Sequence, residues 1–169
     1  TKGDIFLAIK GKNKDGHNYV KDALKNGASK VIVNKKLNII KKKQQIKIHN
    51  SMSFLNKISK NTRFYSSAKI IAITGSAGKT SLKNLVSFTL KKYGNVYSSP
   101  KSFNNHYGVP LSLSNLKEKT KFGVFEIGMS KKGEISTLSN MVKPNVAVIT
   151  NISAAHVENF KNLKDIAKE

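Results

Sequence analysis

The residues best suited to chemistry in this sequence lie in one glycine-containing turn, TGSAGKT, at positions 74–80. Gly75 and Gly78 allow the backbone to come close to a phosphate, because glycine adopts conformations that other residues avoid. If a helix starts here, its first amides and its dipole favour an anion. Lys79 can neutralise phosphate charge, and the hydroxyl of Thr80 can reach a magnesium ion held by a nucleotide. The turn therefore predicts a phosphate-binding loop.

The turn departs from the general phosphate-loop pattern G-x-x-x-x-G-K-[ST] at one position, because Ile73 stands where the first glycine is expected. The alternative interpretation is an ordinary strand-to-helix turn with an incidental lysine. The flanking pattern favours the phosphate loop, since an apolar stretch precedes the turn and a helix-like segment follows it.

Two further side chains, Glu126 and His156, stand where predicted strands end. Glu126 is near the C-terminal end of the apolar segment 121–128. His156 follows the apolar segment 145–151. A buried carboxylate is costly unless it is paired or bound to a cation, and open α/β sheets bind ligands beyond the C-terminal ends of their strands. We therefore expect Glu126 beside Thr80, sharing its magnesium ion, and His156 at a second divalent ion. The alternatives are a surface or lysine-paired glutamate, and a histidine in a loop or at a helix start.

The elements that must position these residues change character at Lys69. Before it, apolar patterning predicts two strands, two helices and a further short strand. The two strands are at 5–9 and 30–34, the two helices are at 19–28 and 51–66, and the further short strand is at 46–50. After it, strands and helices alternate at 69–74, 79–93, 95–98, 109–116, 121–128, 133–142 and 145–151, with another helix from about 162. Such alternation indicates a parallel sheet covered on both faces. We predict an α/β protein with a small α/β domain at 1–67 and a parallel-sheet phosphate-loop domain at 68–169.

Composition excludes several classes of protein. The chain has 169 residues and a formal net charge of +22, which would suit nucleic-acid binding. Arg63 is the only arginine, however, and the lysines are spread along the whole chain, which favours a compositional bias over a specific nucleic-acid surface. The absence of cysteine excludes disulfides and thiol zinc sites, and no apolar run approaches the ~20 residues that a membrane span needs. We expect a cytoplasmic protein with no specific nucleic-acid partner and no obligate protein partner.

Read together, these segments resemble the ATP-dependent Mur ligases of peptidoglycan synthesis over nearly all of the chain. GDIFLAIKGKNKDGHNYVKDALKNGASKVIV is similar to the N-terminal domain that binds the UDP-sugar substrate. ITGSAGKTSLKNLV is similar to the family's variant phosphate loop, which explains the missing first glycine. FNNHYGVPLSL and FEIGMSKKGEISTLSNMVKPNVAVITNISAAHVENF follow in the order of the central ATPase domain.

The resemblance implies a reaction and its substrates. NNHYGVPLSL, EIGMSKKGEI and AAHVENF are most similar to the members that add D-Ala-D-Ala to UDP-MurNAc-tripeptide. ATP would phosphorylate the terminal carboxylate of the tripeptide. The amine of D-Ala-D-Ala would then attack the acyl phosphate, and phosphate would leave. The implied cofactors are ATP and Mg²⁺.

The resemblance also implies roles for individual residues. Lys79 would stabilise the transferring phosphoryl group, and the implied catalytic residues are Lys79, Glu126 and His156. The implied ATP-binding residues are Gly75, Ser76, Ala77, Gly78, Lys79, Thr80, Ser81 and Asn151. The implied metal ligands are Thr80, Glu126 and His156. The implied substrate-side residues are Asn104 and Asn105 near the phosphoryl group, and Asp15, Gly16 and His17 on the UDP side.

The match also has limits. The chain begins at Thr1, in what resembles the middle of the first substrate-binding segment, and ends at Glu169 inside the central domain. We expect this piece alone to be inactive and its sheet to have an exposed edge. Lys168 does not match the lysine that is carbamylated in some relatives. Three alternatives remain open: another Mur-type ligase step, a phosphate-loop nucleotide-binding module without ligase chemistry, and a basic nucleic-acid-binding protein.

Overall fold

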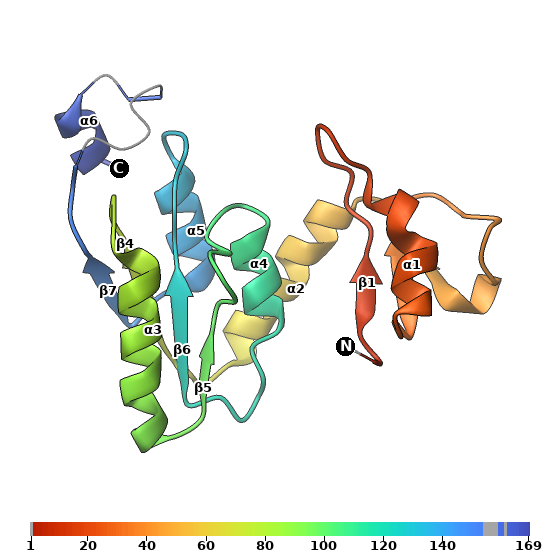
Figure 1. Ribbon diagram of the computed structural model, residues 1–169, viewed down its shortest axis with the longest axis horizontal. Helices are drawn as coiled ribbons and strands as arrows, with labels where there is room; N and C mark the ends of the chain where they lie inside the picture. The colour runs from red at the N-terminus through yellow and green to blue at the C-terminus, as the bar shows by residue number, and fades with distance from the viewer. Residues whose placement is uncertain (1, 154–158, 161) are drawn as a thin grey trace. The chain divides into compact units, whose positions relative to one another are not determined.

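The computed structural model describes residues 2–153, 159–160 and 162–169. The chain forms two compact units, Thr1–Asn56 and Lys57–Glu169, and the division falls within helix α2 (Ser51–Tyr65). The sequence pattern places the domain boundary just after the end of the same helix. Each unit contains a parallel β-sheet with helices (Figure 1). The predicted α/β class with parallel sheets is therefore confirmed.

The first unit is built on a small parallel sheet with the strand order β1-β2-β3. Its strands are β1 (Ile5–Leu7), β2 (Lys30–Val33) and β3 (Gln45–Lys47). Its helical segments are the 3-10 turn η1 (Gly16–Tyr19), helix α1 (Val20–Lys25) and the 3-10 turn η2 (Lys42–Gln44). The core of the unit consists of small and β-branched side chains, namely Ala8, Val20, Val31 and Val33.

The second unit is built on a four-stranded sheet with the order β5-β6-β4-β7, in which all pairs are parallel. Its strands are β4 (Lys69–Thr74), β5 (Val96–Ser98), β6 (Phe122–Glu126) and β7 (Val146–Ile149). Its helices after α2 are α3 (Lys79–Leu90), the 3-10 turn η3 (Lys91–Tyr93), α4 (Gly108–Ser114), α5 (Glu134–Val142) and α6 (Leu163–Ala167).

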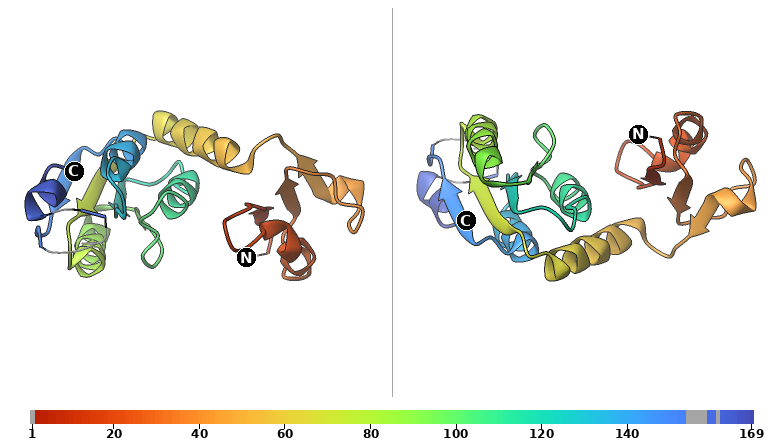
Figure 2. Two further views of the ribbon diagram at one scale, coloured as in Figure 1. Left: turned by 90° about the horizontal axis from the view of Figure 1, so that it is seen from above. Right: turned by 90° about the horizontal axis from the view of Figure 1, so that it is seen from below.

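Helices cover both faces of this second sheet, and Figure 2 shows α3 and α5 on opposite sides of it. Ile70 and Ala72 of β4 and Phe125 of β6 pack with residues of α4 and α5 in one core cluster. Because successive side chains of a strand point to opposite faces, Val124 and Glu126 point to the other face, where α3 lies against β6. The end of β6 therefore presents a carboxylate to the helix that follows the glycine turn.

The helices predicted at 19–28 and 79–93 are α-helical over only part of their ranges. The helix predicted at 19–28 begins with the 3-10 turn η1, and α1 ends at Lys25, two residues before Gly27. Gly27 has a φ of 98°, a left-handed conformation that commonly ends a helix. The helix predicted at 79–93 is α-helical to Leu90 and continues as η3 before Gly94.

A separate property concerns membranes. No helix in the described ranges is both long enough and apolar enough to cross a bilayer.

Candidate phosphate-binding site

The glycine turn connects β4 to α3, and its two glycines are needed for different reasons. Gly75 has a φ of 129°, and a Cβ at this position would lie 2.1 Å from the hydroxyl oxygen of Thr150. Gly78 is the N-cap of α3 with a φ of 79°, and a Cβ there would meet no atom within 4 Å. The first glycine thus permits close packing against the segment after β7, and the second leaves open space beside the first turn of α3.

Hydrogen bonds from the segment after β7 hold this loop in place. The backbone amide of Ala77 donates to the side-chain oxygen of Asn151 at 2.9 Å, and the amide of Ser76 donates to its carbonyl at 3.0 Å. The hydroxyl of Thr150 donates to the carbonyl of Ala77 at 2.6 Å. The ammonium of Lys79 donates to the carbonyl of Gly75 at 2.6 Å. The structure thus places Asn151 in contact with the phosphate loop, and the side chain of Lys79 reaches back from α3 to bond the start of the loop.

Glu126 is the acidic side chain at the centre of the site. It is 1% exposed, and it lies at the end of β6 in register with Ile73 of β4. Its Oε2 atom accepts a hydrogen bond from the hydroxyl of Thr80 at 2.8 Å, and its Oε1 atom accepts one from the amide of Asn104 at 2.8 Å. Three residues singled out from the sequence therefore meet at one carboxylate.

Lys83 also belongs to this group: the sequence left a lysine-paired Glu126 open as an alternative, and the structure shows this pair, but the sequence reasoning did not identify Lys83 as the partner. Its ammonium lies 3.7 Å from Oε2 of Glu126 and donates to the carbonyl of Ser99 at 2.9 Å. The signal that could have found it is helical spacing, because Lys83 follows Thr80 by three residues and Lys79 by four. Residues three and four apart share one face of a helix.

Other predicted site residues have different surroundings. The side chain of Asn105 accepts hydrogen bonds from the amides of Tyr107 and Gly108 at 3.1 and 2.9 Å, which caps the start of α4. Ser81 is exposed in the first turn of α3. His156 lies outside the described residues. Among the residues that are described, no group of three or more acidic, histidine or cysteine side chains could hold a metal ion.

Asp15, Gly16 and His17 lie in the first unit, where they form a compact turn. The backbone amide of His17 donates to a carboxylate oxygen of Asp15 at 2.9 Å, and its Nδ1 atom lies 2.6 Å from the same oxygen. These two hydrogen bonds lower the pKa of the Asp15 carboxyl. The amide of Asn34 donates to Nε2 of His17 at 3.2 Å. Both ring nitrogens therefore have protein partners, and a Cβ on Gly16 would lie 2.7 Å from the amide nitrogen of Ile9.

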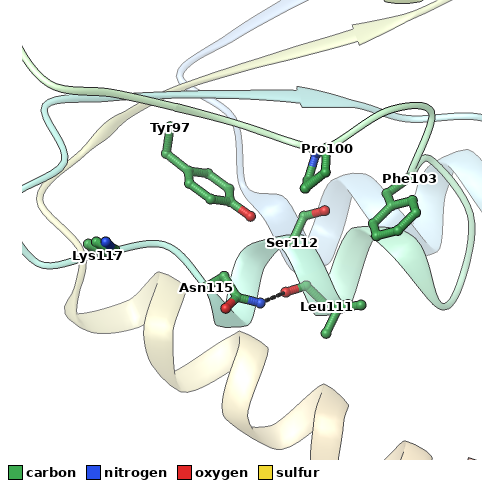
Figure 3. Close-up of a pocket in the computed structure, with 7 residues that line it drawn as sticks. All are labelled: Tyr97, Pro100, Phe103, Leu111, Ser112, Asn115 and Lys117. Carbon is green, nitrogen blue, oxygen red and sulfur yellow. Dashed lines mark hydrogen bonds between the residues drawn. The ribbon is translucent and has the colours of Figure 1, made fainter. Parts of the chain in front are cut away.

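A pocket of about 350 Å³ lies in the second unit, between the segment from Tyr97 to Phe103 and helix α4 (Figure 3). Its walls include the rings of Tyr97 and Phe103 and the side chains of Leu111 and Ser112. Tyr97 packs against the core cluster that includes α4 and α5, so the pocket lies on the face of the sheet opposite Glu126. It is separate from the phosphate loop.

Comparison with known proteins gives two family matches. The model of the Mur ligase middle domain matches residues 73–169, which is more than half of the chain, and the model of the Mur ligase family catalytic domain matches residues 1–65. The UDP-N-acetylmuramoyl-tripeptide--D-alanyl-D-alanine ligase of Rickettsia prowazekii is 44% identical over 167 residues, which cover 99% of this chain and 37% of that protein. The chain therefore spans little more than a third of the length of the curated relatives it matches.

Solved structures of Mur ligases are also similar to this chain. MurF from Acinetobacter baumannii is similar with a TM-score of 0.84 and 32% sequence identity, over 99% of this chain and 37% of that one. The MurF ligase from Thermotoga maritima, solved in complex with ADP, has a TM-score of 0.79 and 33% identity, over 99% of this chain and 39% of that one.

Proposed function

The chain belongs to the Mur ligase family, and from this premise we propose that the whole protein is an ATP-dependent ligase of peptidoglycan precursor synthesis. The proposed reaction joins D-Ala-D-Ala to UDP-MurNAc-tripeptide through an amide bond, in the cytoplasm. The name of the R. prowazekii relative describes this reaction, and the T. maritima relative was solved with ADP. The ADP in that complex supports ATP as the nucleotide.

The contact between the phosphate loop and one buried carboxylate carries the proposal. Oε2 of Glu126 accepts a hydrogen bond from the hydroxyl of Thr80 at 2.8 Å, at the C-terminal ends of β6 and β4. Ligands of α/β sheets bind at such strand ends. Burying a charge is costly, and Lys83 pairs with this acid at 3.7 Å, so a buried acid–lysine pair lies beside the first helical residues that follow the turn. In this position, beside the hydroxyl of Thr80, the acid is placed to bind the cation of a nucleotide.

The atoms at this contact fit a hard divalent cation. Mg²⁺ prefers oxygen ligands and is commonly held by one or two carboxylates together with substrate phosphates. Glu126 offers a carboxylate and Thr80 a hydroxyl, and we assign these two residues to the first ion. His156 is our candidate ligand for a second ion. When bound, Mg²⁺ neutralises phosphate charge and orients the nucleotide.

The residues of the loop bind and orient the nucleotide in this proposal. The amides at the start of α3, from Gly78 to Ser81, face the phosphates, and Asn151 holds the loop in shape through its hydrogen bonds with Ser76 and Ala77. Lys79, which donates to the carbonyl of Gly75 in this structure, exchanges that partner for a phosphate oxygen. Its charge then stabilises the phosphoryl group during transfer.

The reaction proceeds in two steps, a phosphoryl transfer and the formation of the amide bond. The bond between ADP and the γ-phosphorus breaks as a carboxylate oxygen of the tripeptide bonds to that phosphorus, which gives an acyl phosphate. The amine of D-Ala-D-Ala then bonds to the acyl carbon, phosphate leaves with its oxygen, and the amine loses a proton. Asn104, which contacts Glu126, lines the phosphoryl side, and Asn105 supports it from the next position by capping α4; correct positioning of the reacting groups contributes much of the rate.

For the two parts of the chain we propose a division of labour. Residues 1–67 bind the UDP-sugar end of the substrate, and residues 68–169 bind ATP. Asp15, Gly16 and His17 contribute by fixing the shape of a substrate-contacting turn, because both ring nitrogens of His17 already have protein partners.

Calorimetry with ADP and Mg²⁺ tests the nucleotide site. We compare the chain with Lys79→Ala and Glu126→Ala, and use Glu118→Ala as a matched control, because Glu118 is an exposed acid. We expect both site variants to bind at least about tenfold more weakly, since each loses a charge-assisted interaction. The control should bind like the parent chain.

The ligase reaction is assayed with the full-length gene product. We expect phosphate release that requires both UDP-MurNAc-tripeptide and D-Ala-D-Ala. Phosphate release that is independent of both would contradict the ligase proposal. Folded protein that binds no nucleotide, both as this chain and at full length, would contradict the phosphate-loop assignment as well.

A further inference from the structure

A buried lysine lies on α3, one turn after the phosphate loop. The proposed reaction gives it no role. Lys83 is on α3, and its side chain is only 2% exposed. Lysine is almost never fully buried unless it is paired. The partners of Lys83 therefore indicate why it is there.

The ammonium of Lys83 is surrounded by three acceptors. It donates to the carbonyl of Ser99 at 2.9 Å and to the carbonyl of Lys101, and it lies 3.7 Å from Oε2 of Glu126. A separation of 3.7 Å is too long for a good hydrogen bond but is within the range of an ion pair. The side chain of Glu126 is also 2% exposed, so water compensates neither charge. Lys83 supplies the charge that Glu126 needs, while Thr80 and Asn104 make its hydrogen bonds.

The two carbonyls that hold Lys83 belong to the segment between β5 and α4. Lys101 has a φ of 47°, a left-handed conformation that is uncommon for a residue other than glycine. Three residues later, Asn104 donates to Oε1 of Glu126 at 2.8 Å. Lys83 therefore joins α3, the segment that carries Asn104 and the end of β6 at one point.

We propose that Lys83 is the resident counter-ion of Glu126, a positioning residue that makes binding of a divalent cation depend on a bound nucleotide. The role in nucleotide binding rests on the proposed function. Lys83 already compensates the charge of Glu126, and Lys79, four residues before Lys83 on α3, adds a second positive charge on the same side of the helix. A free divalent cation therefore meets a site with excess positive charge, whereas a complex of the cation with a nucleoside triphosphate or diphosphate does not carry that penalty.

Manganese alone is the probe for this proposal, and the signal of the free ion in electron paramagnetic resonance measures its binding. The chain is compared with Lys83→Met, which keeps the length of the side chain without its charge, and with Lys83→Gln, which keeps a donor for the carbonyls. Lys92→Met is the control, because Lys92 is an exposed lysine just after the same helix. Circular dichroism confirms that each variant is folded.

We expect the parent chain and Lys92→Met to bind free Mn²⁺ weakly. Removing the charge of Lys83 should tighten the binding of free Mn²⁺ at least about tenfold, because the cation no longer faces the ammonium. With ADP present, the parent chain should bind Mn²⁺ much more tightly than without it, and the two Lys83 variants should lose most of this difference.

Three results would overturn the proposal. The first is a parent chain that binds Mn²⁺ as tightly without ADP as it does with ADP. The second is a folded Lys83→Met or Lys83→Gln variant that binds free Mn²⁺ as weakly as the parent. The third is an equal gain in affinity for free Mn²⁺ in Lys92→Met, which would show that the effect comes from the net charge of the chain and not from the position of Lys83. The failure of ADP to bind the parent chain would contradict the proposed function instead, and the free-Mn²⁺ comparison would still decide the role of Lys83.

Discussion

The hydroxyl of Thr80 donates a hydrogen bond to Oε2 of Glu126 across 2.8 Å, although 46 residues separate the two in the sequence. The strands β4 and β6 are parallel neighbours with Ile73 opposite Glu126, so the loop after β4 and the end of β6 meet at the same edge of the sheet. Glu126 is buried, whereas Thr80 is exposed. The hydroxyl of an otherwise exposed residue therefore stabilises a buried carboxylate.

Replacement of Thr80 tests the value of this hydroxyl. Thr80→Val keeps the shape of the side chain but removes the donor, and we expect the free energy of unfolding to fall by about 1–2 kcal/mol. We also expect weaker Mg²⁺-dependent binding of ADP. Thr80→Ser keeps the hydroxyl and should resemble the parent chain in both properties. Urea denaturation followed by circular dichroism and calorimetry measure the two effects. A Thr80→Ser variant as impaired as Thr80→Val would show that the methyl group, and not the hydroxyl, is important.

The two glycines of the phosphate loop should respond differently to alanine. Gly75→Ala places a methyl group 2.1 Å from the hydroxyl oxygen of Thr150 and 2.9 Å from the carbonyl of Asn151, at a φ of 129°. We expect a loss of about 3 kcal/mol or more in the free energy of unfolding, because strain and overlap add. Gly78→Ala meets no neighbouring atom and should lose only about 1–2 kcal/mol from its left-handed backbone. Equal losses in urea denaturation would contradict this distinction.

The sequence predicted the elements that position the site because their patterns are local. The apolar run before Gly75 and the helical spacing after it identify β4 and α3, and these elements are present in the structure. An acid at the end of an apolar strand indicated that Glu126 needs a partner. The meeting of Thr80 and Glu126 then followed from the general rule for the ends of parallel strands.

The contacts that depend on tertiary packing could not be predicted in this way. Lys83 is one lysine among many, and its burial depends on the carbonyls of Ser99 and Lys101, which the chain brings to it from another segment. Asn104 and Asn105 are neighbours of the same type, yet one contacts Glu126 and the other caps α4. Residue type and spacing do not distinguish between these uses.

Arg63, the one arginine of the sequence, should be important for stability. Its guanidinium donates to the carbonyls of Val142 and Lys143 at 2.7 and 2.8 Å, and so completes the C-terminal end of α5 from the end of α2. Arg63→Met should lower the free energy of unfolding by about 2–3 kcal/mol, because two carbonyls lose a charged donor. Arg63→Lys should recover only part of this loss, since an ammonium lacks the planar fork of the guanidinium.

Lys60→Met is the matched control for Arg63, because it removes one positive charge from an exposed position of the same helix. Urea denaturation of the three variants measures the effect. An equal loss in Lys60→Met would mean that charge, and not the hydrogen bonds to α5, stabilises this region.

Glu134 should make the stability of the second unit depend on pH in the acid range. Its Oε2 atom accepts hydrogen bonds from the amides of Ser130 and Lys131 at 2.5 and 3.0 Å, and the first of these bonds is the main cause that lowers the pKa of its carboxyl below 4.5. A carboxyl whose pKa is lower in the folded state than in the unfolded state contributes stability above the unfolded value, and this contribution is lost as the pH falls through the folded value. Glu134→Gln should therefore be less stable than the parent chain from neutral pH to about pH 5, and the difference in the free energy of unfolding should shrink below pH 4.5.

Urea denaturation at a series of pH values measures this difference, with Glu118→Gln, at an exposed position, as the control. A difference that stays constant into strong acid would mean that the hydrogen bonds of Glu134 do not depend on its charge.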